Sequence, residues 1–253
     1  TEEYDPELRF RPISGGVGLL VGVLLIALSL FHYVTAGIGP LEHRFHTGVH
    51  LAFVLGLIFL IFPVRRSMQC EELASRWPCW GGVPLYDWTL FAIAVVVALF
   101  PAIALSGLAR LWSGTPHPLH DPSVLDVVMG SLMVAVVLET TRRAMGRTLP
   151  FICLLFIAYA LLGEHAPAPL THDGHGWPSL VKYLYFSTDG IYGLSVLVIA
   201  SYVFHFVLFG VFAMRIGLGE LFLDLAYSIA GRFVGGPAKI SVLSSAFVGM
   251  ISG

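Results

Sequence analysis

The chain has 253 residues, of which 57% are hydrophobic and 12% are charged. Soluble domains usually carry about 25% charged residues, so this composition excludes an ordinary soluble protein and indicates an integral membrane protein. The formal net charge is -2. The basic residues flank apolar runs instead of forming a stripe, so no nucleic-acid partner is expected.

Six apolar runs have the composition of transmembrane helices. They cover residues 16–36, 47–64, 88–108, 124–140, 149–162 and 191–214. A helix needs about 20 apolar residues to cross hydrocarbon about 30 Å thick, so the fourth and fifth runs are short. The fifth run either begins a few residues earlier or lies tilted. The predicted fold class is an all-α integral membrane protein with about six transmembrane helices.

The distribution of basic residues predicts the orientation of these helices. With a cytoplasmic N-terminus, eleven basic residues lie on the cytoplasmic side and three on the other, a clear positive-inside bias. We therefore expect a multi-pass membrane protein with six crossings and a cytoplasmic N-terminus. In this topology Cys70 and Cys79 share a cytoplasmic loop, so a disulfide between them is not expected.

Two further segments are typical of interfacial helices. Residues 177–186 combine Trp and Tyr with Lys182, and residues 218–233 are amphipathic, with Glu220 and Asp224 on one face. The basic stretch at residues 139–150 connects the fourth and fifth runs. We place the domain boundary there, with one domain at 1–145 and a second at 146–253.

The last 17 residues, 237–253, would form a helix about 25 Å long. Small residues share one narrow face of that helix, which allows close approach to another backbone. They are Ala238, Ser241, Ser245, Gly249 and Ser252, opposite a bulky face of Ile240, Leu243, Phe247 and Ile251. The polar end at Ser252 and Gly253 favours the first arm of a re-entrant hairpin. The alternative is an ordinary span with a small packing face.

These residues also resemble a known family. The stretch GELFLDLAYSIAGRFVGGPAKISVLSSAFVGMISG is similar to the approach to the first hairpin of the large membrane subunit of tripartite ATP-independent periplasmic (TRAP) transporters. YLYFSTDGIYG and VLETTRRAMGRTLPFICLLFIAYALLG resemble the fused permeases of that family, in which a four-helix small subunit precedes the large one. The fused form is typical of systems with a TAXI-type binding protein.

The resemblance implies a secondary importer of organic anions, such as carboxylates, in a bacterial or archaeal cytoplasmic (inner) membrane. A periplasmic substrate-binding protein delivers the substrate, a Na⁺ or H⁺ gradient supplies the energy, and the transport domain moves as an elevator. It assigns residues 1–145 to the scaffold and 146–253 to the beginning of the large subunit. Ser252, Gly253 and Ser245 then lie at the ion or substrate site, while Ala238, Ser241 and Gly249 provide a close-packing face. The remaining transport domain would follow Gly253, so we expect a fragment that does not transport alone.

Other polar residues allow rival interpretations. His205 lies in the sixth run and is either a proton relay or a packing histidine. His43, His46 and His50 suggest a histidine-using membrane enzyme, but the usual three or four zinc ligands are incomplete, so no metal is expected. No phosphate-binding loop or nucleophile–base set is present, so we expect neither an ATPase nor another enzyme. The remaining alternative is a non-transporting scaffold for a separate transport subunit.

Asp87 is predicted to cap the third helix, and Glu139 to pair with Arg142 and Arg143 at the end of the fourth.

Overall fold

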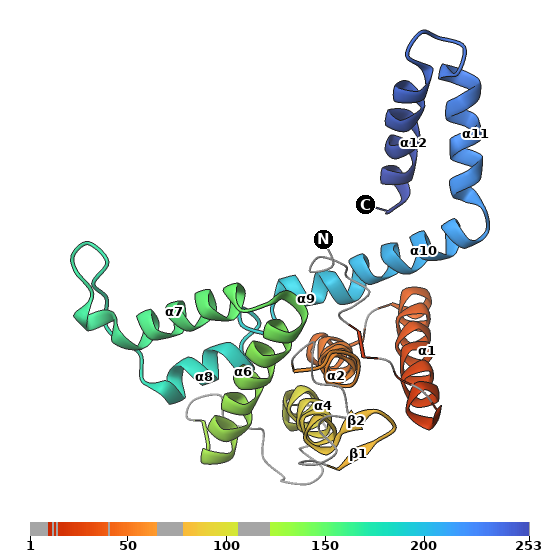
Figure 1. The fold of residues 1–253 in the computed structure, drawn as a ribbon. Helices are drawn as coiled ribbons and strands as arrows, with labels where there is room; N and C mark the ends of the chain where they lie inside the picture. The colour runs from red at the N-terminus through yellow and green to blue at the C-terminus, as the bar shows by residue number, and fades with distance from the viewer. Residues whose placement is uncertain are drawn as a thin grey trace. The chain divides into compact units, whose positions relative to one another are not determined.

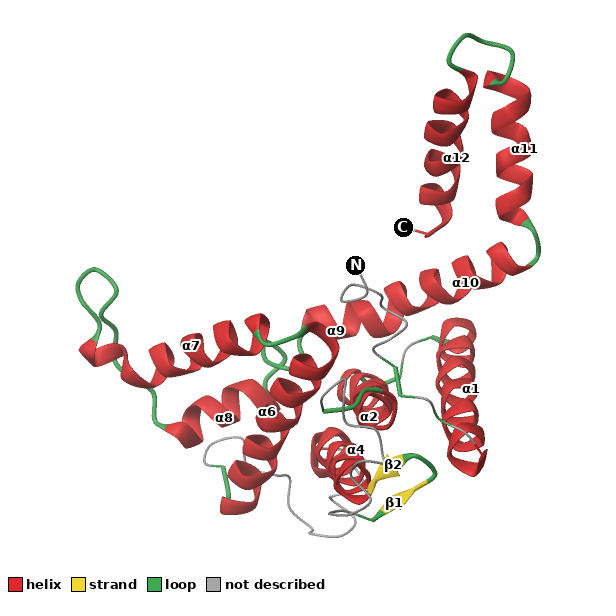
Figure 2. Ribbon diagram, in the orientation of Figure 1, coloured by secondary structure: helices red, strands yellow, loops and turns green. Residues whose placement is uncertain are grey.

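The computed structural model describes residues 10–11, 13, 15–39, 41–64, 78–105 and 122–252. Most of these residues lie in helices (Figures 1 and 2). Six helical segments among them are long and apolar enough to cross a membrane. The predicted all-α membrane fold is therefore confirmed.

The first five spans form on the predicted runs, with shifted ends. They are α1 (Gly15–Ile38), α2 (His43–Ile61), α4 (Leu85–Leu105), α6 (Val124–Met145) and α7 (Thr148–Leu162). Helix α2 begins four residues early because the side chain of Glu42 accepts the backbone N–H of Phe45 at 2.9 Å.

The fourth run was predicted to be short, and helix α6 resolves this by extending to Met145. It begins with a capping box, in which the Ser123 hydroxyl accepts the Asp126 N–H and the Asp126 carboxylate accepts the Ser123 N–H. The fifth run begins only one residue before its predicted start. Its helix α7 has 15 residues and continues into a 3-10 turn, η3 (Gly163–His165).

The remaining helices include both predicted interfacial segments, as α8 and α11, and the terminal segment, as α12. The sixth span is one continuous helical run that changes from α to π and back to α. In chain order they are α8 (Trp177–Phe186), α9 (Leu194–Val198), the π-helix η4 (Ile199–Val203), α10 (Phe204–Arg215), α11 (Leu218–Ala230) and α12 (Gly236–Ser252).

A short hairpin that the sequence reasoning missed precedes α4. Strands β1 (Cys79–Trp80) and β2 (Val83–Pro84) pair antiparallel across Gly81 and Gly82, whose φ angles are 58° and 83°. Two positive φ angles define the turn that best matches strand twist, and glycine adopts them without strain.

Cys79, at the start of this hairpin, is disulfide-bonded, so the expectation that it stays reduced is wrong. The expectation rested on a cytoplasmic position for this loop, whereas disulfides persist in oxidising compartments. The disulfide and the basic residues thus favour opposite sides of the membrane for the loop. Cys153 on α7 is a free, exposed cysteine.

The chain divides into two compact units. The first comprises Thr1–Leu28 and Leu41–Leu197, and the second comprises Ser29–Pro40 and Val198–Gly253. The predicted domain boundary near residue 145 falls inside the first unit. That boundary separates the part predicted to be like the small subunit from the part predicted to belong to the large subunit, and it stays a prediction.

The core of the first unit lies where α2 packs against α4. Glycines permit the close approach: a Cβ on Gly48 would lie 3.0 Å from the carbonyl oxygen of Ala98, and one on Gly56 would lie 3.0 Å from the ring of Phe91. Phe59, near the end of α2, is completely buried. Small residues at helix contacts are typical of membrane proteins, where close backbone approach drives association.

Two tyrosines compensate for a proline in the middle of α4. Pro101 has no N–H, so the carbonyl of Val97, four residues earlier, lacks its helical donor. The Tyr185 hydroxyl donates to this oxygen at 2.5 Å, and the Tyr192 hydroxyl donates to the neighbouring Ala98 oxygen at 2.8 Å. Both tyrosines are almost fully buried.

Burial raises the pKa of both hydroxyls, and the charge of Asp126 raises that of Tyr185 further. Each tyrosine therefore stays protonated and can donate. The two bonds attach α8 and the segment after it to α4.

Candidate functional site

The candidate site is the helical pair at the end of the second unit, formed by α11 and α12. The two helices lie side by side and antiparallel (Figure 1). Helix α11 ends where the Gly231 N–H donates to the Tyr227 oxygen at 2.8 Å, and the first turn of α12 includes a bond from the Lys239 N–H to the Gly235 oxygen. Pro237 is tolerated in that first turn because its position needs no helical donor.

The large side chains of α12 face α11. Ile240, Leu243 and Phe247 are half-buried, and the Phe247 ring lies 5.5 Å from that of Phe222 on α11, measured between centroids. On α11 the matching face includes Ala226, which is completely buried. Part of the bulky face of α12 thus packs against α11, with Phe247 against Phe222.

The opposite, small-residue face of α12 is exposed within the described part of the chain. Ala238, Ser241, Ser245 and Gly249 are all exposed, and a Cβ on Gly249 would meet nothing within 4 Å. Ala238, at the start of this face, also lines a groove between α12 and α11, and the predicted close packing of the face stays a prediction.

Two of the residues predicted at the hairpin tip, Ser252 and Gly253, lie at the very end of the chain. Ser252 closes α12, and its side chain lies outside the described part of the chain, as does Gly253. Ser245 is described and exposed, one helical turn below Gly249. Of the three predicted ligands, the structure places only the Ser245 side chain, and it lies on the small-residue face.

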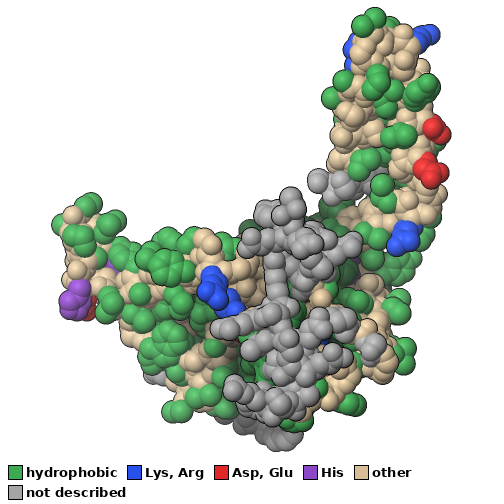
Figure 3. Space-filling view, in the orientation of Figure 1, with side chains coloured by type: hydrophobic (Ala, Val, Ile, Leu, Met, Phe, Trp, Pro, Cys, Tyr) green, Lys and Arg blue, Asp and Glu red, His purple; other side chains and the backbone are tan. Residues whose placement is uncertain are grey.

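The outer surface of the helical pair formed by α11 and α12, called the α11–α12 hairpin below, is amphipathic. Figure 3 shows hydrophobic side chains over both helices and acidic side chains along one edge of α11. The acidic residues of α11 are Glu220 and Asp224, both exposed, and Leu221 and Leu225 beside them are exposed as well. This pattern is typical of a helix at the boundary between headgroups and hydrocarbon.

His205 lies at the start of α10, directly after the π-helical turn. Its Nε2 lies 2.6 Å from the backbone oxygen of His32, which also accepts the Thr35 hydroxyl at 3.0 Å. Because a carbonyl oxygen only accepts, Nε2 must carry the proton. The ring centroids of His205 and His32 are 5.7 Å apart, and His32 is completely buried.

The other ring nitrogen of His205 is available as a proton acceptor. Nδ1 is buried and has no hydrogen-bond partner among the described residues, and the same holds for the hydroxyl of Ser201 in the π-helical turn. Isolated π-helical turns inside α-helices occur frequently at functional sites. This arrangement allows His205 to take up a proton, and it equally satisfies a packing histidine through Nε2.

Several charged residues at the ends of α2, α4 and α6 form one ionic network, which the sequence patterns did not predict. Asp87 is completely buried and accepts bonds from Arg11 at 2.5 Å and Arg143 at 2.7 Å. Arg143 also donates to Glu139 at 2.8 Å, and Arg142 binds both oxygens of Glu139 at 2.7 Å. The predicted pairing of Glu139 is confirmed.

The predicted N-cap role of Asp87 is wrong, because α4 begins at Leu85 and Asp87 lies in its first turn. Asp87 and Arg11 are 76 residues apart in the sequence, so local sequence patterns do not reveal the contact between them. That contact decides the role of Asp87. Arg143 also donates to the Phe62 oxygen at 3.2 Å and lies over the Phe59 ring at 4.8 Å. The network locks helix ends together and leaves no open site.

The histidines of α2 do not assemble a metal site among the described residues. No group of three or more His, Cys, Asp or Glu side chains there is placed to hold a metal ion. His43 contacts the backbone oxygen of Tyr192 at 2.6 Å, whereas His46 and His50 are buried in α2.

Comparison with known protein families gives one match. Residues 132–253 match the family model described as "Tripartite ATP-independent periplasmic transporter, DctM component". The match begins within α6 and includes all of α7 to α12, so this part of the chain is similar to the DctM component. The comparisons with curated proteins and with solved structures found no match.

Proposed function

We propose that the chain belongs to a fused membrane permease of a TRAP transporter. Residues 1–145 would be the small-subunit-like scaffold, and residues 146–253 would belong to the large subunit. The observation that carries this proposal is the DctM match over residues 132–253, which includes the α11–α12 hairpin. The six candidate spans give the multi-pass membrane protein that this function needs.

The proposed transport is secondary and binding-protein-dependent. A periplasmic protein of the TAXI type delivers an organic anion, such as a carboxylate, and a Na⁺ or H⁺ gradient drives uptake across the inner membrane. An elevator motion requires a surface that moves past a fixed frame. The exposed small-residue face of α12 suits such a contact, because small side chains let two backbones approach closely.

The coupling-ion site is proposed at the end of α12. Hydroxyl and backbone carbonyl oxygens are suitable ligands for a hard cation, and broken helices in transporters present such groups at mid-membrane. Ser245, Ser252 and Gly253 would contribute them. The Ser245 side chain is exposed on the small-residue face. It is therefore accessible to an ion that further ligands from another part of the permease would also bind.

Uptake into proteoliposomes that contain the full permease and its binding protein tests this function. Labelled carboxylates should enter under an imposed Na⁺ or proton gradient and not without one. Ser245→Ala should raise the ion concentration that gives half-maximal uptake. Ser228→Ala is the matched control, because the Ser228 hydroxyl is exposed and bonds to the Leu225 oxygen. Gradient-independent uptake, or equal effects of the two changes, would count against the proposal.

His205 is the proposed relay if protons are the coupling ion. His205→Gln keeps an N–H donor for the His32 oxygen but removes the second ring nitrogen, which can accept a proton. Proton-driven uptake should then lose its pH dependence. His175→Gln, which changes an exposed histidine of the loop after α7, should leave it intact. An unchanged pH profile in His205→Gln would make His205 a packing residue.

A scaffold without transport activity is the second candidate. It is favoured by the extent of the family match, which leaves α1, α2 and α4 unmatched although α2 and α4 form a well-packed core. Such a scaffold would copurify with a separately encoded transport subunit and would bind no coupling ion by itself.

A further inference from the structure

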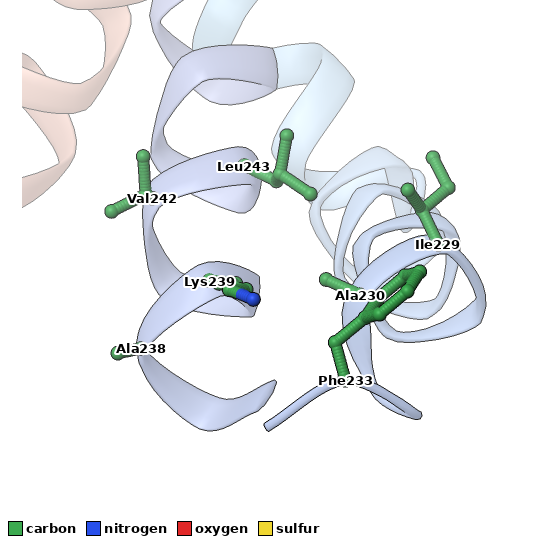
Figure 4. Close-up of a pocket in the computed structure, with 7 residues that line it drawn as sticks. All are labelled: Ile229, Ala230, Phe233, Ala238, Lys239, Val242 and Leu243. Atoms are coloured by element: carbon green, nitrogen blue, oxygen red, sulfur yellow. The ribbon is translucent and has the colours of Figure 1, made fainter. Parts of the chain in front are cut away.

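An apolar groove lies between α11 and α12 near the turn that joins them. Its volume is about 610 Å³, within the range of about 300–1,000 Å³ that is typical of ligand pockets. Six of its seven lining residues are apolar, and the seventh is Lys239. Figure 4 shows Lys239 extending from α12 toward α11, with Ala230 and Phe233 on the other side.

Two basic side chains lie near Phe233, which lines this groove. The Lys239 Nζ lies 5.4 Å from the Phe233 ring centroid, and the Arg232 guanidinium carbon lies 5.6 Å from it. Neither forms an ion pair with another described residue, and the first turn of α12 carries no acidic residue. The acidic residues of α11 lie in its first half, away from the turn. Two positive charges therefore lie beside the groove, and no described carboxylate pairs with either of them.

The turn also exposes large apolar side chains beside these charges. Phe233 is 53% exposed and Val234 is 96% exposed. Aromatic and aliphatic side chains beside Lys and Arg are typical of segments that lie at an anionic membrane surface. This combination indicates that the turn sits at the headgroup level, with the groove opening toward hydrocarbon.

We propose that the groove binds one anionic phospholipid. The phosphate lies between Arg232 and Lys239, and an acyl chain follows the apolar wall that includes Ala230, Ala238 and Val242. A soluble anion would match the charges but would leave the apolar wall exposed. A zwitterionic lipid would match the wall but would not neutralise the charges. A bound lipid holds the turn of the hairpin at the membrane surface, whichever function the chain performs.

Native mass spectrometry of the detergent-solubilised chain tests the proposal with added phosphatidylglycerol or phosphatidylcholine. The unmodified chain should bind phosphatidylglycerol more tightly. The double change Arg232→Gln and Lys239→Gln should weaken phosphatidylglycerol binding by about 25-fold, or roughly fivefold for each basic residue near an anionic surface. Both side chains are exposed, so the fold should persist. Arg215→Gln, at the end of α10 and outside the groove, is the control and should bind normally.

Two further variants examine the apolar wall. Ala238→Trp fills the groove and should weaken binding of both lipids without removing charge. A photo-crosslinking residue in place of Val242 should capture lipid when the chain is in phosphatidylglycerol vesicles. Equal affinity for the two lipids, an equal loss in Arg215→Gln, or crosslinking to a protein segment in place of lipid would overturn the proposal. Equally tight binding of inorganic phosphate would do the same.

Discussion

Asp87→Asn is expected to destabilise the protein strongly. The carboxylate is completely buried and binds Arg11 and Arg143, whose side chains are 7% and 1% exposed. Removing one partner of a buried ion pair costs about 3–5 kcal/mol, because the remaining charge is left uncompensated. Arg143 keeps Glu139, so we expect the lower end, about 3 kcal/mol.

Thermal unfolding of the purified chain in detergent measures this effect. At about 2–4 °C per kcal/mol for a chain of this size, the midpoint should fall by about 6–12 °C. Asp224→Asn removes an exposed carboxylate from α11 and should change stability by no more than about 0.5 kcal/mol.

A double-mutant cycle separates the ionic contact from general damage to the helix. Arg11→Met combined with Asp87→Asn should be less destabilising than the sum of the two single changes, because the first change removes a cation that needs Asp87. A coupling of about 0.5–3 kcal/mol is expected for residues in one network. Strict additivity, or a fall in midpoint no larger than that of Asp224→Asn, would refute the reasoning.

Three other changes test the packing, the topology and the small-residue face. Tyr185→Phe should cost about 1–3 kcal/mol in unfolding free energy because it leaves the buried Val97 carbonyl with only the long bond, 3.4 Å, from the Tyr192 hydroxyl, and Pro101→Ala should reduce that cost by restoring the helical N–H. A cysteine in place of Gly174 should be labelled from outside the cell, and a cysteine in place of Ser67 only from the cytoplasm. Ser67 lies outside the described residues. The reverse labelling pattern would overturn the predicted orientation and would agree with the disulfide of Cys79. Gly249→Leu should impair uptake by the full permease, whereas Gly249→Ala should not, and normal uptake with leucine would exclude close packing there.

The positions of the helices follow from the sequence because hydropathy acts locally. Each predicted apolar run forms a helix, and the corrections concern helix ends, such as the start of α2 beside its cap Glu42 and the end of α6 beside its cap Gly146. The terminal helix is similarly local: its periodicity predicts a bulky face with Leu243 and Phe247 and a small face with Gly249, and the structure has both. A span needs only enough apolar residues in succession to bury its own backbone polar groups.

The contacts between these helices depend on the tertiary structure, because they join residues that the chain keeps far apart. The sequence marked Asp87 as a local cap, but its charge is neutralised by Arg11 and Arg143 on other elements. Likewise, the carbonyl that Pro101 frees is satisfied by Tyr185, 88 residues from its bonding partner. Local patterns decide which segments cross the membrane, whereas the pairing of buried charges and carbonyls requires the fold, since each needs a partner at a definite distance.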